Sequence, residues 1–360
     1  MVVLTANNAE LLDIHYHSQI KGTNIKSRLK LWTPLLKSAS NPNDIGLLVT
    51  YIKALTEFCN VNPRWATTAL RKNCEYLTAL SVKETDQSTL EDVASALRAA
   101  FKVTLVDNEN EQHKMGRTLE CYSMSVFLLA LYVHMRAYTL AEGILQATIQ
   151  YHDNIPPLES SPPQVQTKFL FYKGCLKFFK LDYASAVQCF EQSLDVVQYR
   201  IPTVQFEHIM AYLIPAKYLH SHKVPSSAVW EALPKLKELY SPLFLASRQG
   251  NWSEFETLLK TRSALLSDSR ILLSLEAMSG IVRLNLLHRL WLIKGSPKRL
   301  ELEDFALSLE TAKVIPQGVP ALEAAEFYIA QLIADGEVKG YIHDEYKLLL
   351  LSSTSAFPNL

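Results

Sequence analysis

The hydrophobic pattern changes abruptly near the C-terminus of the chain. Over Pro320–Asp335 the apolar residues recur at helical spacing, with proline at a first-turn position and Gly336 as a stop. Residues 338–342 then form a short β-prone segment, and after a polar turn Lys347 leads into an apolar return strand that ends at residue 351. The pattern predicts an amphipathic helix followed by a β-hairpin.

Two upstream segments complete this C-terminal unit. Residues Ser279–Ile293 and Glu301–Ala312 are also amphipathic at helical spacing. Helices followed by a closing hairpin are typical of a winged helix. The alternative is a terminal hairpin that packs on an unrelated helical domain.

The rest of the pattern is helical. Asn41-Pro42, Asn62-Pro63 and Ser88 predict helix starts, the last with Glu91 completing a capping box. Short polar connectors join these helices, which indicates an α-solenoid. Further helices are expected at residues 117–135, 138–151, 203–220, 228–240, 252–262 and 269–293.

One segment has a partial tetratricopeptide pattern, with Gly174, Tyr183, Ala186 and Phe190 at its key positions. Proline-rich residues 153–163 precede it and break the helical pattern. The prediction is a mainly α protein, a right-handed α-solenoid of TPR-like helical hairpins fused to a C-terminal winged helix. The expected parts are an N-terminal helical-repeat region at 1–160, a helical part at 161–293 and a winged-helix part at 294–360.

Composition narrows the function classes. The 48% apolar content is that of a globular protein, and the formal net charge of zero gives no global attraction to nucleic acid. Five scattered cysteines suggest reduced thiols in the nucleus or cytosol. The first residues lack a signal-peptide pattern, and the longest apolar run, Val126–Val133, is too short to span a membrane. We expect no membrane association.

The sequence contains no recognisable catalytic or cofactor motif. Glycine is sparse, at 11 residues, and neither a dinucleotide-binding nor a P-loop pattern occurs. The pairs His15/His17 and His220/His222 are two residues apart, which places them on different helix faces. We expect no catalytic, cofactor or metal residues, and therefore a protein that is not an enzyme.

Four segments of the chain resemble one family. They are residues 211–217 (AYLIPAK), 250–255 (GNWSEF), 329–343 (IAQLIADGEVKGYIH) and 356–358 (AFP). They are similar to motifs of PCI-domain proteins, in the branch that holds the PCI subunit of the nuclear-pore-associated mRNA-export complex and its signalosome-associated paralogue. The resemblance runs from about residue 165 to the C-terminus.

This resemblance implies a non-catalytic scaffold of a nuclear complex that couples transcription to mRNA processing and export. The nuclear pore and the cytoplasm are further expected locations. The alternatives are the signalosome-associated subunit, linked to splicing or transcription elongation, and a helical peptide-binding adaptor without nucleic-acid contact. Acidic Glu323 and Glu326 in the expected recognition helix, with Asp344 after the histidine, argue against direct reading of DNA bases.

The resemblance also implies a small, acidic, disordered partner on the solenoid. Lysines and aromatic rings gather in one predicted helix, where Coulomb attraction and apolar anchors offset the ordering entropy of such a chain. The alternative is a solvated lysine face. The candidate residues are Lys168, Phe169, Tyr172, Lys173, Lys177 and Lys180.

The winged helix has two further candidate surfaces. Cations that flank its helices and wing could hold RNA or DNA phosphates weakly, the alternative being ordinary surface ion pairs. They are Arg289, Lys294, Lys298, Arg299, Lys313 and Lys339. The exposed edge could pair with a second PCI-like subunit, the alternative being packing within the domain. Its candidates are Tyr341, Tyr346 and Phe357.

Overall fold

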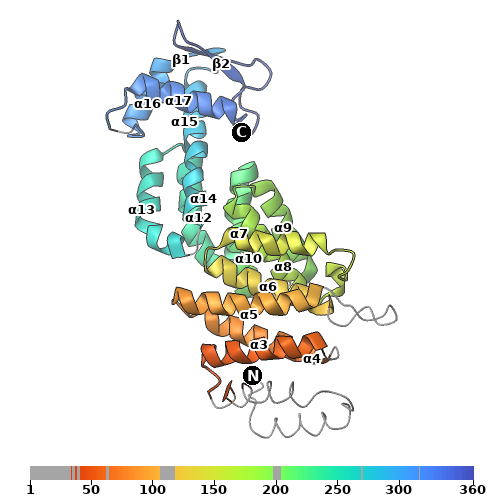
Figure 1. The fold of residues 1–360 in the computed structure, drawn as a ribbon. Coiled ribbons are helices and arrows are strands. Elements are labelled where there is room, and N and C mark those ends of the chain that lie inside the picture. Colours follow the sequence, from red (N-terminus) through yellow and green to blue (C-terminus); the bar gives the residue numbers. More distant parts are fainter. Residues whose placement is uncertain are drawn as a thin grey trace. The chain divides into compact units, whose positions relative to one another are not determined.

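The computed structural model shows stacked helices followed by a small three-stranded sheet (Figure 1). It describes residues 34, 37–38, 41–61, 65–105, 118–197, 204–268, 271–315 and 317–360. The predicted helix start at Asn62-Pro63 and the pair His15/His17 lie outside these residues. The mainly helical fold with a C-terminal winged helix is confirmed.

The described residues form two compact units. The first comprises residues up to Leu176, together with residues 192–198. It contains α3 (Ile45–Val61), α4 (Trp65–Ser81), α5 (Gln87–Leu105), η2 (Thr118–Glu120), α6 (Cys121–His134), α7 (Tyr138–Gln150), η3 (Leu158–Ser160) and most of α8 (Pro163–Phe179).

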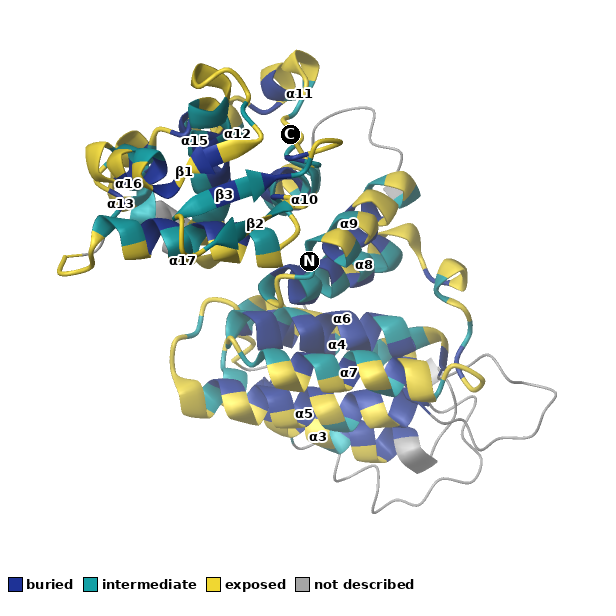
Figure 2. Cartoon of the chain, turned by 90° about the horizontal axis from the view of Figure 1, so that it is seen from above, coloured by how far each residue is buried: buried dark blue, intermediate teal, exposed yellow. Residues whose placement is uncertain are grey.

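Helix α6 is the most enclosed element of the first unit, and Figure 2 shows it largely dark blue. Its residues are apolar on all sides, as expected for a helix surrounded by others. Leu128, Leu129 and Leu131 are completely buried. Helices α4, α5 and α7 pack against it. The unit therefore has its own hydrophobic core.

Two helix starts differ from the prediction. Asp44 Oδ1 accepts a hydrogen bond from Leu47 N, so Asp44 caps α3 in place of Asn41. Asp86 Oδ2 accepts from both Thr89 N and Thr89 Oγ1, so Asp86 caps α5 in place of Ser88. These bonds lower the pKa of Asp86 below its ordinary value. Both aspartates satisfy an amide that has no partner within the helix.

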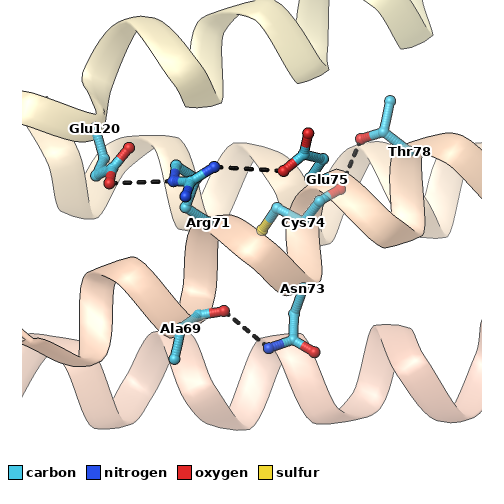
Figure 3. Close-up of polar contacts among 7 residues, drawn as sticks. All are labelled: Ala69, Arg71, Asn73, Cys74, Glu75, Thr78 and Glu120. Carbon is cyan, nitrogen blue, oxygen red and sulfur yellow. Dashed lines mark hydrogen bonds and ion pairs between the residues drawn. The ribbon is translucent and has the colours of Figure 1, made fainter. Parts of the chain in front are cut away.

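An arginine links α4 to the start of α6 (Figure 3). Arg71 Nε lies 3.2 Å from Glu120 Oε1, and Arg71 Nη1 lies 3.3 Å from Glu75 Oε2 one turn further along α4. The side chains of Arg71 and Glu120 are 26% and 20% exposed, which protects this pair from solvent screening better than a fully exposed one.

The second unit comprises Lys177–Glu191 and Tyr199–Leu360. After the first part of α9 (Tyr183–Val197), its helices are α10 (Val204–Ser221), α11 (Ser227–Ala232), α12 (Pro234–Arg248), α13 (Trp252–Asp268), α14 (Leu272–Ala277) and α15 (Ser279–Ile293). Two predicted helices are each divided. Pro234 begins a new helix because it has no amide to continue the previous one, and Met278 separates α14 from α15.

Pro215 lies inside α10 and leaves one carbonyl of that helix without its usual donor. The missing amide would have bonded to Ala211, four residues earlier. The Tyr240 hydroxyl on α12 donates to Ala211 O at 2.7 Å. Tyr240 is completely buried, and burial raises the pKa of its phenol. Pro215, the proline of the AYLIPAK segment, therefore frees a carbonyl of α10 to accept a hydrogen bond from α12.

Gly250 allows the chain to turn from α12 into α13. Its φ of +63° is unfavourable for other residues, and an added Cβ would lie 2.7 Å from Leu286 N on α15. Asn251 Oδ1 then accepts from Glu254 N at the start of α13. Glycine is needed here both for its backbone conformation and for the close approach of this turn to the backbone of α15.

The winged helix consists of α15, β1 (Arg299–Glu301), α16 (Leu302–Thr311), α17 (Ala321–Ala334), β2 (Gly340–His343) and β3 (Leu348–Leu351). The antiparallel sheet has the order β1-β3-β2, which makes β3 the central strand. Strand β1 is not anticipated by the sequence pattern, because three residues with one buried leucine are too short a signal. One shared core joins α15, α16, α17 and the sheet; its fully buried members include Leu287, Phe305, Leu309, Ile329 and Leu349.

Candidate partner and nucleic-acid surfaces

The sheet of the winged helix has two unlike faces. Leu349 and Leu351 are buried in the core, and Ile342 packs against it. Because side chains alternate along a strand, the residues between them point outward. Two cross-strand rows result on the outward face. They are Arg299–Leu350–Tyr341 and Glu301–Leu348–His343.

Two of the candidate nucleic-acid cations already have partners. Lys294 directly follows α15, and its Nζ lies 2.7 Å from Asp304 Oδ1 on α16. Arg289 is exposed on α15 and donates to the carbonyl of Gln249. The ion pair offsets the positive charge that Lys294 can offer to a phosphate, whereas the hydrogen bond occupies one N–H group of Arg289 and leaves its charge in place.

The other four candidate cations are exposed. Their side chains have no ion-pair partner among the residues that the structure describes. Lys298 and Arg299 lie at the β1 edge of the sheet, Lys339 directly precedes β2, and Lys313 follows α16 in a left-handed conformation. Strand order places the first two and Lys339 at opposite edges of the sheet.

The three candidate pairing residues divide into two groups. Tyr341 and Tyr346 are 61% and 70% exposed, and Tyr341 belongs to the edge strand β2. Phe357 is only 8% exposed, with its ring centre 4.8 Å from that of His288 and 5.2 Å from that of Trp291. Phe357 packs within the domain and offers no free surface to a partner.

Phe357 belongs to a C-terminal tail that docks on the winged helix. Lys339 N donates to Ala356 O at 2.9 Å, which continues the hydrogen bonding beyond β2. Burial lowers the pKa of His288, beside the Phe357 ring, below its ordinary value. The neutral imidazole is the form that this apolar contact favours.

The sequence pattern did not single out Arg283, which connects three helices. Its guanidinium lies 4.4 Å from the ring centre of Tyr328 on α17 and 5.5 Å from that of Trp252 on α13. Burial lowers the pKa of Arg283 below its ordinary value. Held between two aromatic rings, it fixes the last helical hairpin to the winged helix.

The exposed side of α17 contains no cation. Its exposed residues are Glu323, Phe327, Ala330, Gln331 and Ala334. Phe327 is 65% exposed. Beside it, Glu326 Oε1 lies 2.6 Å from Lys347 Nζ in the β2–β3 turn. This helix therefore lacks the positive side chains with which recognition helices contact DNA.

The candidate residues of α8 differ in exposure. Within the first unit, Lys168 is exposed and Tyr172 and Lys173 are half-buried. Phe169 is 6% exposed and packs edge to face on Tyr122 at 5.0 Å, so it belongs to the core. Within the second unit, Lys177 pairs with Asp182 at 3.4 Å and Lys180 is exposed. The prediction for Phe169 as an anchor therefore needs correction.

The described residues contain no group of three histidine, cysteine or acidic side chains that could hold a metal ion. All five cysteines are buried; burial raises the pKa of Cys121 to about 12 and also raises the pKa of Cys74. Such thiols are protonated and poor nucleophiles. Among the described helices, none has the length and apolar character to cross a bilayer.

Comparison with known proteins agrees with this architecture. Residues 253–353 match the PCI domain family. A CSN12 homolog of Schizosaccharomyces pombe is 26% identical over 81% of this chain and 67% of its own length. A PCI domain-containing protein 2 homolog of Drosophila melanogaster is 25% identical, with coverages of 82% and 70%. For COP9 signalosome complex subunit 12 of Kluyveromyces lactis, the identity is 22% and the coverages are 76% and 68%.

These matches cover between 61% and 78% of the lengths of the curated relatives, so they describe a shared part of each protein. Helices α14 to α17 and the three-stranded sheet lie within the PCI match at residues 253–353, and the turn at Gly250 precedes it. The chain therefore contains a PCI domain at residues 253–353 and is similar over most of its length to CSN12 homologues and to a PCI domain-containing protein 2 homolog.

Proposed function

We propose that the chain is a non-enzymatic scaffold subunit of a nuclear complex that couples transcription to mRNA processing and export. It would hold partner chains and contribute a basic surface for RNA or DNA. The observation that carries this proposal is the winged helix, in which unpaired cations and exposed tyrosines surround a sheet with two edges.

The partner surfaces follow from exposure and charge. The edge strand β2, with Tyr341 and Tyr346 beside it, suits pairing with a second PCI-like subunit. Exposed Lys168 and half-buried Tyr172 and Lys173 suit contacts with an acidic, disordered chain. Phe357 and Phe169 are left out of both surfaces because they are buried.

Filter binding of the reconstituted complex tests the basic surface. Reversing Lys298 and Arg299 with Lys298→Glu and Arg299→Glu should reduce RNA retention, because each cation that neutralises a phosphate releases counterions. The matched control is Lys235→Glu with Lys237→Glu, an equal charge change at exposed positions of α12 in the same unit. Unchanged retention in the first variant would favour a peptide-binding adaptor without nucleic-acid contact.

A second candidate function is that of a signalosome-associated subunit. It is favoured by the Kluyveromyces lactis relative, whose name places it in the COP9 signalosome. Affinity purification followed by mass spectrometry distinguishes the two. Recovery of nuclear-pore-associated export components supports the first proposal, and recovery of signalosome subunits supports the second.

A further inference from the structure

The outward face of the three-stranded sheet combines aromatic rings, aliphatic side chains and cations. We propose that this face is a stacking platform for an unpaired nucleic-acid strand. The inference rests on the proposed nucleic-acid role and adds to it the binding face and the form of the ligand. It assigns base stacking to Tyr341 and Tyr346 and phosphate contacts to Arg299 and Lys339.

Strand register places these groups together. Arg299 and Tyr341 both pair with Leu350, from opposite sides of the central strand. Directly opposed residues of an antiparallel sheet share a face. Arg299, Leu350 and Tyr341 therefore form one row across the sheet, with the cation at one end and the phenol ring at the other.

Lys339 extends the same face along the chain. Ser352 N donates to Lys339 O at 2.8 Å, so the pairing continues one residue beyond the assigned strand. Lys339 precedes Tyr341 by two residues and so points to the same side of the sheet. Both Lys339 and Arg299 are exposed, and neither has an ion-pair partner in the described part of the chain.

The aromatic surface continues toward the β2–β3 turn. The ring centres of His343 and Tyr346 are 4.9 Å apart. His343 lies two residues after Tyr341 and therefore on the same face. Exposures of 61% for Tyr341 and 70% for Tyr346 leave both rings open to a flat ligand. Figure 1 shows α16 and α17 on the other side of the sheet.

Negative side chains gather at one end of this face, beside the β2–β3 turn. Glu301 shares the row of His343, and Asp344 and Glu345 lie in the adjoining turn. Asp344 forms an ion pair with Lys347, which lowers the pKa of Asp344 below its ordinary value. Arg299 and Lys339 lie on opposite edges of the sheet, but both lie away from this acidic turn along the strand direction, so phosphates are favoured beside them and bases over the tyrosines.

The same charges distinguish an unpaired strand from a duplex. The exposed side of α17 has no cation and begins with Glu323, which disfavours insertion into a major groove. Bases of a single strand present their flat faces, and stacking on aromatic side chains contributes about 1–3 kcal/mol per base. A duplex hides those faces.

Subunit pairing and nucleic-acid binding would use different parts of β2. A partner strand would add in the plane of the sheet, through the backbone edge of β2. A nucleic-acid strand would lie on the side chains, perpendicular to that plane. The two roles are therefore separable by substitution of side chains that leave the backbone edge unchanged.

Fluorescence anisotropy of the full chain with a labelled single-stranded oligouridine tests the inference. A duplex RNA of equal length is the comparison. Tyr341→Ala should weaken oligouridine binding about 5- to 150-fold, the equivalent of one stacked base. Tyr341→Phe should bind oligouridine with the affinity of the unmodified chain, because the ring and not the hydroxyl makes the contact.

Salt dependence tests the phosphate contact. Arg299→Gln should reduce the slope of log affinity against log salt by about 0.7, the value for one phosphate of a single strand. Phe327→Ala, a control for the exposed side of α17, should leave the affinity unchanged. Thermal unfolding shows whether each variant remains folded.

Three results would overturn the inference: equal affinity of Tyr341→Ala and the unmodified chain, equal affinity for duplex and oligouridine, or a loss of affinity in Phe327→Ala. The basic surface would still stand if Lys298→Glu with Arg299→Glu abolished binding while Tyr341→Ala did not. Loss of a co-purifying subunit in Tyr341→Ala with unchanged RNA affinity would show that this face docks protein.

Discussion

Single side chains in this protein compensate for local breaks in regular structure. The Tyr240 hydroxyl satisfies the carbonyl that Pro215 leaves open in α10, and the guanidinium of Arg283 fills the space between the Trp252 and Tyr328 rings. A buried carbonyl without a donor costs about 1–3 kcal/mol, which is large compared with the stability of a domain.

The pair Pro215 and Tyr240 can be tested by a double substitution. Tyr240→Phe should reduce the free energy of unfolding by about 1–3 kcal/mol, because Ala211 O loses its donor. In the background of Pro215→Ala the loss should be smaller, since alanine restores the helical amide. Urea unfolding measures both.

Tyr76→Phe is the matched control for this cycle, because the Tyr76 hydroxyl contacts Asn43 at an exposed site. It should change stability by less than about 0.5 kcal/mol. If Tyr240→Phe costs the same with and without Pro215→Ala, the two residues are not coupled and the explanation of the proline is wrong.

At the scale of elements, the β-hairpin of the winged helix depends on two glycines. Gly340 begins β2 opposite Leu351, and a Cβ added there would collide with the Leu350 carbonyl oxygen. The glycine is required for close strand approach. Gly336 is required for a different reason, since its φ is +76° and its surroundings are open.

This difference gives a prediction for the hairpin. Gly340→Ala should reduce stability on the order of 2 kcal/mol, because the added methyl group has no room. It should also increase hydrogen exchange of the β3 amides. Gly336→Asn should have a much smaller effect, because asparagine tolerates a left-handed conformation. Similar losses in both variants would contradict the steric argument.

Sequence pattern predicted the helices and hairpin of the winged helix within a few residues. The predicted helix Pro320–Asp335 corresponds to α17 at Ala321–Ala334, and residues 347–351 correspond to β3 at Leu348–Leu351. The pattern did not find the division before Pro234 or the caps Asp44 and Asp86. Helix ends depend on single hydrogen bonds, which several nearby polar residues could have made.

At the scale of the whole molecule, the C-terminal tail connects segments that are far apart in the chain. His222, 137 residues before Asn359, has its Nδ1 3.2 Å from Asn359 O. Asn359 Nδ2 donates to Glu337, and Phe357 packs against His288 and Trp291 on α15. The tail therefore contacts three segments of the second unit: the end of α10, the connection before β2, and α15.

Acidification should weaken the packing of the C-terminal tail on α15. Burial lowers the pKa of His288, so the unfolded chain takes up its proton at a higher pH, near the ordinary value of about 6.5. The stabilisation from the neutral imidazole is complete above that pH and is lost as the pH falls below it. The unfolding temperature should therefore drop between about pH 7.5 and 5.5, in part through His288.

Variants separate this contribution from that of the other histidines. His288→Gln should show a smaller drop between the two pH values, and His220→Gln, at an exposed site, should behave as the unmodified chain. Equal drops in all three proteins would exclude His288 as the acid-sensitive group.

The sequence by itself determined the helical class, the C-terminal winged helix and the resemblance to PCI-domain proteins, because periodicity, glycine positions and short motifs are local signals. Zero net charge also showed that any nucleic-acid contact must be local. Tertiary structure decided which candidate residues are exposed and unpaired, and can therefore contact a partner or a nucleic acid. Phe169 and Phe357 are buried, Lys294 is paired, and Arg299 shares a sheet face with Tyr341. Exposure and cross-strand neighbours depend on contacts between distant segments, which no local pattern contains.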